Sequence, residues 1–162
     1  MSSTSLSKLN FPDILYVAEN MSEWDKKEIY AGRWTEDPYD FAQQVDSMGA
    51  VGFVVHHDDK PVSVVCAYPI SPTLWNVTMF STNQFEKTWF TTIKYIKRLF
   101  IPAIVSTGAL RAECRSMDGH DLAHRWLQCI GFKNEGINKM VGKNGEDFYV
   151  FAFTKDCLQT DS

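Results

Sequence analysis

The segment that is most informative about the fold lies late in the chain and reads Ala123-His-Arg-Trp-Leu-Gln-Cys-Ile-Gly131-Phe132. Its apolar residues recur at helical spacing, and a glycine after the last of them is the usual way to end a helix. Asp118 can cap this helix at its start, so we predict a helix over residues 119–130 that feeds directly into a strand.

Downstream of this stretch the pattern predicts two strands, over residues 132–140 and 148–154. Asn144-Gly145 predicts the hairpin turn between them, because this pair readily adopts the positive φ angles of a type I′ turn. The chain is therefore expected to end in an antiparallel pair.

Upstream, alternating residues predict a three-stranded meander over residues 50–56, 62–68 and 74–80, with its first turn at Asp58-Asp59-Lys60. A long helix is expected over residues 85–100.

Pro102 should kink or end that helix, because proline lacks the N–H and its ring clashes with the preceding turn. A further strand is predicted over residues 110–115.

The first fifty residues predict a short strand at 14–18 and two helices. Ser22 and Asp37 are N-cap residues for helices over 23–33 and 38–48, and Asp25 places a negative charge in the first turn of the former. Helices interleaved with hairpins indicate an α+β fold: a mixed, mostly antiparallel sheet of six or seven strands flanked by about four helices.

Length and composition limit the classes of protein to which this chain can belong. The 162 residues suit one domain, expected over 11–156, with loose ends at 1–10 and 157–162 because these are rich in Ser, Thr and Asp. A net charge of -4 disfavours nucleic acid as the main ligand. The sequence shows neither a signal peptide nor an apolar run long enough to span a bilayer. The four cysteines lack metal-binding spacing, and Cys66 and Cys129 are expected in the core.

The order of elements, together with the helix that runs from Ala123 to Gly131-Phe132, resembles the GNAT N-acetyltransferase superfamily over residues 50–155. The resemblance implies acetyl-CoA bound at a glycine-containing loop of the form [QR]-x-x-G-x-[GA]. The matching stretch here is Gln84-Phe-Glu-Lys-Thr-Trp89, in which Gln84 remains and Lys87 and Trp89 replace the small residues. A tryptophan blocks close approach of the backbone to a phosphate, so we expect a degenerate loop in which Gln84 and Lys87 alone could contact cofactor.

The resemblance also implies a tyrosine general acid on the late helix, at the position occupied by Leu127. Leucine cannot transfer a proton, so no catalytic residue is predicted there. The chain is therefore expected to be a catalytically degenerate GNAT-fold protein that needs no cofactor.

A narrower resemblance is to the small GNAT-like internal virion proteins of short-tailed bacteriophages. It rests on Val77-Thr78, Gln84, Trp89, His124-Arg-Trp-Leu127, Ile130-Gly131 and Phe151-Ala-Phe-Thr154. It implies a structural or assembly component of a phage, with virion, portal or core proteins as partners, in the virion or the host cytoplasm.

Two alternatives remain open. One is a divergent acyl-CoA-dependent N-acetyltransferase, in which backbone donors near residues 77–80 steady the oxyanion and a carboxylate such as Glu113 relays the proton. The other is a phage-encoded inhibitor of a host protein.

Three further groups of side chains were considered as candidate sites: basic residues, histidines and tryptophans. Lys94, Lys97 and Arg98 form a small basic face that is either a solvated helix surface or an interaction surface. His120 and His124 are four residues apart, yet no metal frame surrounds them, so no metal site is predicted. Trp24 and Trp34 would mark a protein interface if they are exposed.

Overall fold

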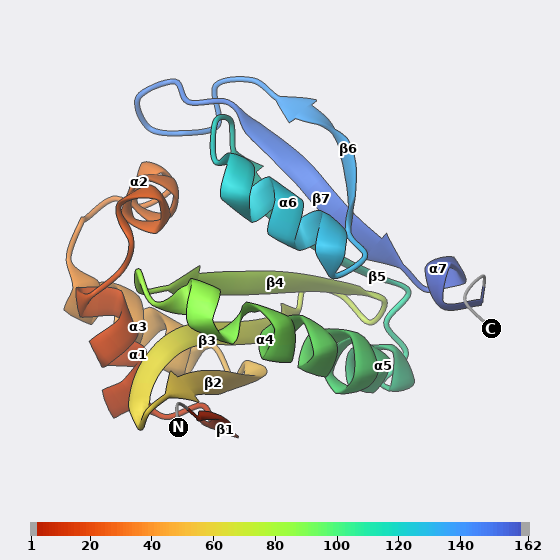
Figure 1. The fold of residues 1–162 in the computed structure, drawn as a ribbon. Coiled ribbons are helices and arrows are strands. Elements are labelled where there is room, and N and C mark those ends of the chain that lie inside the picture. Colours follow the sequence, from red (N-terminus) through yellow and green to blue (C-terminus); the bar gives the residue numbers. More distant parts are fainter. Residues whose placement is uncertain (1–2, 160–162) are drawn as a thin grey trace. The chain divides into compact units, whose positions relative to one another are not determined.

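A computed structural model of the chain describes residues 3–159. Contacts divide the chain into two compact units, Met1–Tyr68 with Thr78–Thr92, and Pro69–Val77 with Ile93–Ser162. The strands form a seven-stranded sheet of order β1-β2-β3-β4-β5-β7-β6 (Figure 1). The predicted α+β class with a mixed, mostly antiparallel sheet is thus confirmed.

The first unit begins with a strand where a loose terminus was expected. Its elements are β1 (Thr4–Lys8), α1 (Phe11–Glu19), α2 (Glu23–Ala31), α3 (Pro38–Ser47), β2 (Val51–His57), β3 (Lys60–Pro69), the end of β4 (Leu74–Ser81), η1 (Phe85–Thr88) and the start of α4 (Trp89–Tyr95). β1 pairs antiparallel with β2, and Leu6 lies opposite Val55. This pairing supplies the backbone partners that the Ser-rich composition does not predict.

The strand predicted at 14–18 is wrong, because these residues lie in α1. Asn10 caps this helix by accepting from the Asp13 amide, and Ile14, Val17 and Ala18 lie buried on one helical face. The run is β-prone by composition, but its i, i+3, i+4 spacing matches the core that α1 covers.

Local signals elsewhere in this unit are confirmed. The Ser22 side chain accepts from the amide of Asp25, and Asp37 accepts from that of Tyr39, so both predicted N-caps are present. Asp58 and Asp59 have φ values of 50° and 66° and connect β2 to β3. The core of the unit joins the helices α1–α3 to the strands β2–β4 and consists of Ile14, Val17, Ala18, Met21, Tyr30, Phe41, Ala42, Val45, Val54, Val64, Cys66 and Phe80.

The second unit holds the start of β4, η2 (Ile96–Phe100), α5 (Ile101–Ser106), β5 (Arg111–Met117), α6 (Asp121–Cys129), β6 (Lys133–Asn138), β7 (Phe148–Thr154) and α7 (Asp156–Gln159). β4 pairs with β5 in parallel, whereas β7 is antiparallel to both β5 and β6. The residues predicted as a loose C-terminal tail begin within α7, and 160–162 lie outside the described residues.

Of the two outcomes predicted for Pro102, an end of the helix is wrong, because helical structure continues through it. The π-helical segment η2 precedes it, and α5 continues through it to Ser106. A widened π turn shifts the hydrogen bonding ahead of the proline, so the missing N–H and the ring are accommodated.

Three further expectations are corrected in this unit. His120, not Asp118, is the N-cap of α6, and the amide of Asp118 donates to the carbonyl of Asp147. Asn144-Gly145 lies within a longer loop, because Asn138 is the residue that pairs with Phe148. Cys129 is exposed, whereas Cys66 is buried as predicted.

Candidate functional site

The turn between β4 and α4 is the candidate site, because it holds the stretch that matches the cofactor loop of the resemblance. β4 ends at Ser81, and η1 begins four residues later at Phe85. Gln84 and Lys87 come from the same turn, and both side chains are exposed. The structure therefore brings the two predicted cofactor residues together within the first unit.

The end of β4 is held by the first turn of α2. The Asp25 carboxylate accepts from the Ser81 amide at 2.8 Å and from the Ser81 hydroxyl at 3.3 Å. The amide of Ser22 donates to the carbonyl of Ser81 at 3.0 Å, and Met21 bridges Thr82. A negative charge of the chain itself thus lies at the end of β4, where it engages the amide and the hydroxyl of Ser81.

Several amides that follow the strand also have acceptors, either in the turn itself or in β3. Those of Thr82 and Phe85 donate to the carbonyls of Val62 and Thr82, respectively. The Gln84 amide donates to the Thr82 hydroxyl at 3.2 Å, and the Lys87 amide donates to the Gln84 carbonyl at 3.1 Å. The amides of Thr82, Gln84, Phe85 and Lys87 thus all donate to acceptors of the protein itself.

Side chains fill the inner part of this turn. The rings of Phe85 and Trp89 lie 5.7 Å apart between centroids, and Trp89 is half-buried. Thr88 is buried, and its hydroxyl donates to the carbonyl of Phe85 at 3.0 Å. At the two positions where the resemblance implies small residues, the chain thus has an exposed lysine and an aromatic ring in contact with another ring.

The position of the implied general acid lies in the second unit. Leu127 is on α6 and is 3% exposed, so it is part of the apolar core. Glu113 on β5, the suggested proton relay, receives a 2.7 Å hydrogen bond from Arg111. Arg111 also binds Glu135 on β6, and this hydrogen bond lowers the pKa of Glu135. Glu113 is therefore held in an ion-pair network.

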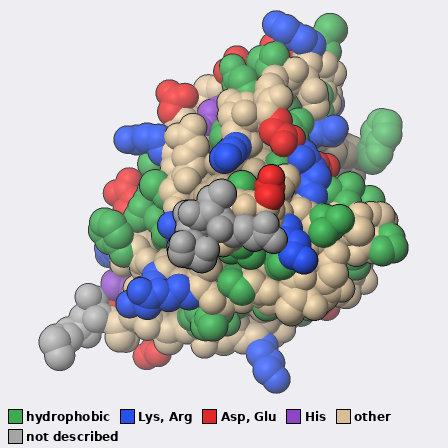
Figure 2. Space-filling view, turned by 90° about the vertical axis from the view of Figure 1, so that its right-hand side faces the viewer, with side chains coloured by type: hydrophobic (Ala, Val, Ile, Leu, Met, Phe, Trp, Pro, Cys, Tyr) green, Lys and Arg blue, Asp and Glu red, His purple; other side chains and the backbone are tan. Residues whose placement is uncertain are grey.

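The basic residues predicted as a face are exposed, at Lys94 on α4 and at Lys97 and Arg98 on η2. On the face drawn in Figure 2, lysine and arginine side chains occur at separate places with apolar and neutral ones between them. Among the described residues visible on that face, the basic side chains form no continuous stripe of the kind that binds a phosphate backbone.

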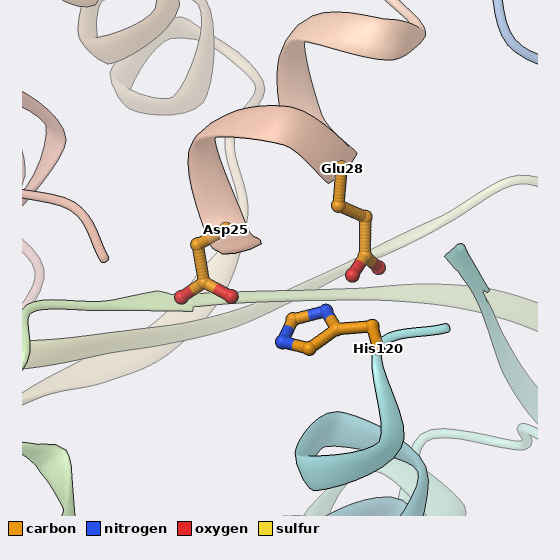
Figure 3. A group of neighbouring side chains, drawn as sticks. All are labelled: Asp25, Glu28 and His120. Atoms are coloured by element: carbon orange, nitrogen blue, oxygen red, sulfur yellow. The ribbon is translucent and has the colours of Figure 1, made fainter. Parts of the chain in front are cut away.

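The histidines of α6 have structural contacts. The His124 ring packs against Phe151 at 5.1 Å, and its Nε2 lies 3.1 Å from the carbonyl oxygen of Met117. His120 is buried at the start of α6. Asp25 and Glu28 project to the same side of α2 (Figure 3), but they belong to the first unit and His120 to the second, so the three do not make up a site of either unit.

Asp25 is the residue at this turn whose role the sequence did not reveal. Its place three residues after Ser22 predicts only a charge in the first helical turn. Ser81 lies 56 residues further along the chain, and no local pattern connects the two. Helix propensity and capping rules act over a few residues, so a contact of this span has no local signal.

No family model and no curated protein matches this sequence. Solved structures do match. A GNAT-family acetyltransferase from Bacillus anthracis has a TM-score of 0.70 and 20% identity, over 94% of this chain and 95% of that one. The ribosomal-protein-S18-alanine N-acetyltransferase of Escherichia coli has a TM-score of 0.67 and 12% identity, over 94% of each chain.

The YncA protein of Salmonella typhimurium, solved with its cofactor acetyl-CoA, has a TM-score of 0.70 and 11% identity, over 93% of each chain. Nearly the full length of each chain is matched at low identity, so the likeness concerns the fold. Within the described residues, no helix is both long and apolar enough to cross a membrane. The element order and these neighbours together establish that the chain has the GNAT N-acetyltransferase fold.

Proposed function

We propose that this GNAT-fold protein acts through protein contacts and does not use the acetyl-CoA loop typical of the fold. The observation that carries the proposal is the closed turn after β4. Its amides at Ser81, Gln84, Phe85 and Lys87 all donate to acceptors within the protein. A pyrophosphate would have to displace these bonds to reach the backbone.

The residues of this turn do not fit acetyl-CoA in the way that the resemblance implies. A glycine loop lets N–H groups approach a phosphate closely, whereas Trp89 packs on Phe85 at this place. Asp25 and Glu86 add negative charge near the turn, which disfavours a polyanion. Lys87 could meet a phosphate only as a point charge, which is a weaker form of recognition.

Within this proposal the setting is the structural or assembly machinery of a short-tailed phage. Support for that setting comes from the sequence resemblance alone, at positions such as Gln84, Trp89 and Leu127. The acidic chain also suits an inhibitor of a host protein, and both roles work through contacts with a protein partner.

The second candidate is a divergent acyl-CoA-dependent N-acetyltransferase. The structural neighbours favour it over the first, because they are acetyltransferases and one was solved with acetyl-CoA. Bound acetyl-CoA would supply a thioester for attack by an amine. Neither Leu127 nor the ion-paired Glu113 is placed to move a proton as the fold's usual residues do.

A thermal melt with and without millimolar acetyl-CoA separates the two candidates. A ligand at about 100 times its dissociation constant stabilises a fold by about 2.7 kcal/mol, a shift of several degrees for a chain of this size. We expect no shift. A clear shift that Lys87→Ala abolishes and Lys26→Ala leaves intact would overturn the first candidate, since it would locate cofactor at the turn; titration calorimetry would then give the affinity.

A further inference from the structure

The helical part of the first unit is strongly acidic. Residues 11–48 contain nine Asp and Glu against three Lys and Arg, a net charge of -6, whereas the whole chain carries -4. The acidic character of the protein is therefore concentrated on α1–α3 and their connections. A surface of one sign attracts partners of the other sign and speeds their association.

Aromatic and acidic side chains stand outward together at the connection between α2 and α3. Trp34 is fully exposed at 102%, and Glu36, Asp37, Tyr39 and Asp40 are exposed beside it in the sequence. These five residues are named the Trp34 patch. The connection is the orange segment between α2 and α3 in Figure 1. A fully exposed tryptophan contributes no burial energy to the fold, and tryptophan is enriched among the residues that carry the binding energy of protein interfaces.

The connection is held at both ends and does not expose Trp34 by fraying. At one end, Arg33 turns back, with its guanidinium carbon 5.0 Å from the centre of the Phe41 ring and a hydrogen bond to Gln44. At the other end, Asp37 accepts from the Tyr39 amide at 3.0 Å and caps α3. The basic side chain of the segment thus lies inward, and the acids and the indole lie outward.

Tyr30, near the end of α2, is a buried phenol that interacts electrostatically with charges of this segment. It is 7% exposed, and its hydroxyl has no hydrogen-bond partner among the described residues. Burial raises the pKa of Tyr30, Arg33 lowers it, and Asp37 and Glu36 raise it further, so these charges act on the phenol at close range. Buried polar groups are normally hydrogen-bonded to protein or to ordered water, so this phenol is a polar group of the interior and not part of the Trp34 patch.

We propose that the Trp34 patch binds an arginine- or lysine-bearing segment of a partner protein. The Trp34 indole offers the best aromatic face for a cation, and Glu36 and Asp37 supply carboxylates for the same group. This inference names the class of partner for the proposed contact function. The negative charge excludes a nucleic acid backbone or an anionic lipid as the occupant.

The test uses the full chain and octa-arginine, with a glycine-serine octapeptide as the uncharged probe, and measures binding by calorimetry at low and high salt. We expect octa-arginine to bind and Trp34→Ala to weaken it by about tenfold, as a lost cation–π contact of about 1.4 kcal/mol requires. Asp37→Asn keeps the cap, since asparagine also caps helices, and should weaken binding while reducing its salt dependence.

Trp24→Ala is the matched control, because Trp24 is also an exposed tryptophan of this unit but has Lys27 over its ring at 4.9 Å. It should leave affinity unchanged. Equal effects of Trp24→Ala and Trp34→Ala, equal affinity for the glycine-serine peptide, or no binding of octa-arginine would each overturn the proposal. Binding of octa-arginine is measured without acetyl-CoA. A melting temperature that rises with acetyl-CoA would therefore refute the proposed function without contradicting the proposal for the Trp34 patch.

Discussion

Replacing Asp25 by alanine tests whether the first turn of α2 holds the end of β4. The carboxylate accepts two hydrogen bonds from Ser81, at 2.8 and 3.3 Å, and both are partly buried. A hydrogen bond to a charged group contributes about 1.5–3 kcal/mol, and the loss leaves the Ser81 amide without this acceptor. We therefore expect Asp25→Ala to lower the free energy of unfolding by about 2–3 kcal/mol.

Two matched variants separate this contact from the general effect of charge at a helix start. Glu23→Ala removes an exposed acid of the same turn, paired with Lys26 at 3.6 Å, and should cost at most about 0.5 kcal/mol. Asp25→Asn keeps an acceptor oxygen and should fall between the two alanine variants.

Urea unfolding gives the global free energy, and hydrogen exchange of the Ser81 amide reports the contact itself. Asp25→Ala should accelerate exchange at Ser81, whereas Glu23→Ala should not. The reasoning fails if Asp25→Ala is as mild as Glu23→Ala, or if Ser81 stays protected in it.

Three other predictions concern single positions. Gly52→Ala should lower the free energy of unfolding by about 2 kcal/mol or more in a urea titration, because its Cβ would lie 2.1 Å from the carbonyl oxygen of Val65; an unchanged midpoint would contradict this. Met140→Gly should raise the melting temperature, because Met140 has a φ of 57° and the left-handed region costs about 1 kcal/mol for a residue that has a Cβ. A lower melting temperature would contradict backbone strain at this position. Iodoacetamide at neutral pH should label the exposed Cys129 well before Cys66, because burial raises the pKa of Cys66 to about 12. Mass spectrometry of tryptic peptides measures the order of labelling, and earlier labelling of Cys66 would contradict this prediction.

Short-range features of this fold are determined by neighbouring residues. Ser22 and Asp37 cap their helices through amides two or three residues ahead, and Asp58 and Asp59 make the tight turn between two strands. Such interactions need no other part of the chain, and helix caps and turn residues follow simple steric rules. The last strand, Phe148–Thr154, was also predicted with its full bounds, because its β-branched and aromatic residues favour a strand.

Tertiary structure decided what several segments became. Ile14 to Ala18 suits a strand by composition, yet Asn10 and the core beneath α1 make it helical. The strand Thr4–Lys8 exists through its pairing with β2, and composition gives no sign of that partner. Long-range burial and pairing outweigh local propensity, since propensity differences are a fraction of a kcal/mol per residue.

The candidate site divides in the same way. The residue types at Lys87, Trp89 and Leu127 are read directly from the sequence, and the resemblance implies small residues at the first two positions and a proton donor at the third. The contact of Asp25 with the end of β4 is visible only in the folded chain, because its partner Ser81 lies 56 residues away. The chemistry that a side chain can perform follows from its residue type, which can be read from the sequence. The hydrogen bonding of the turn after β4 depends on distant segments, because the packed core brings them beside it.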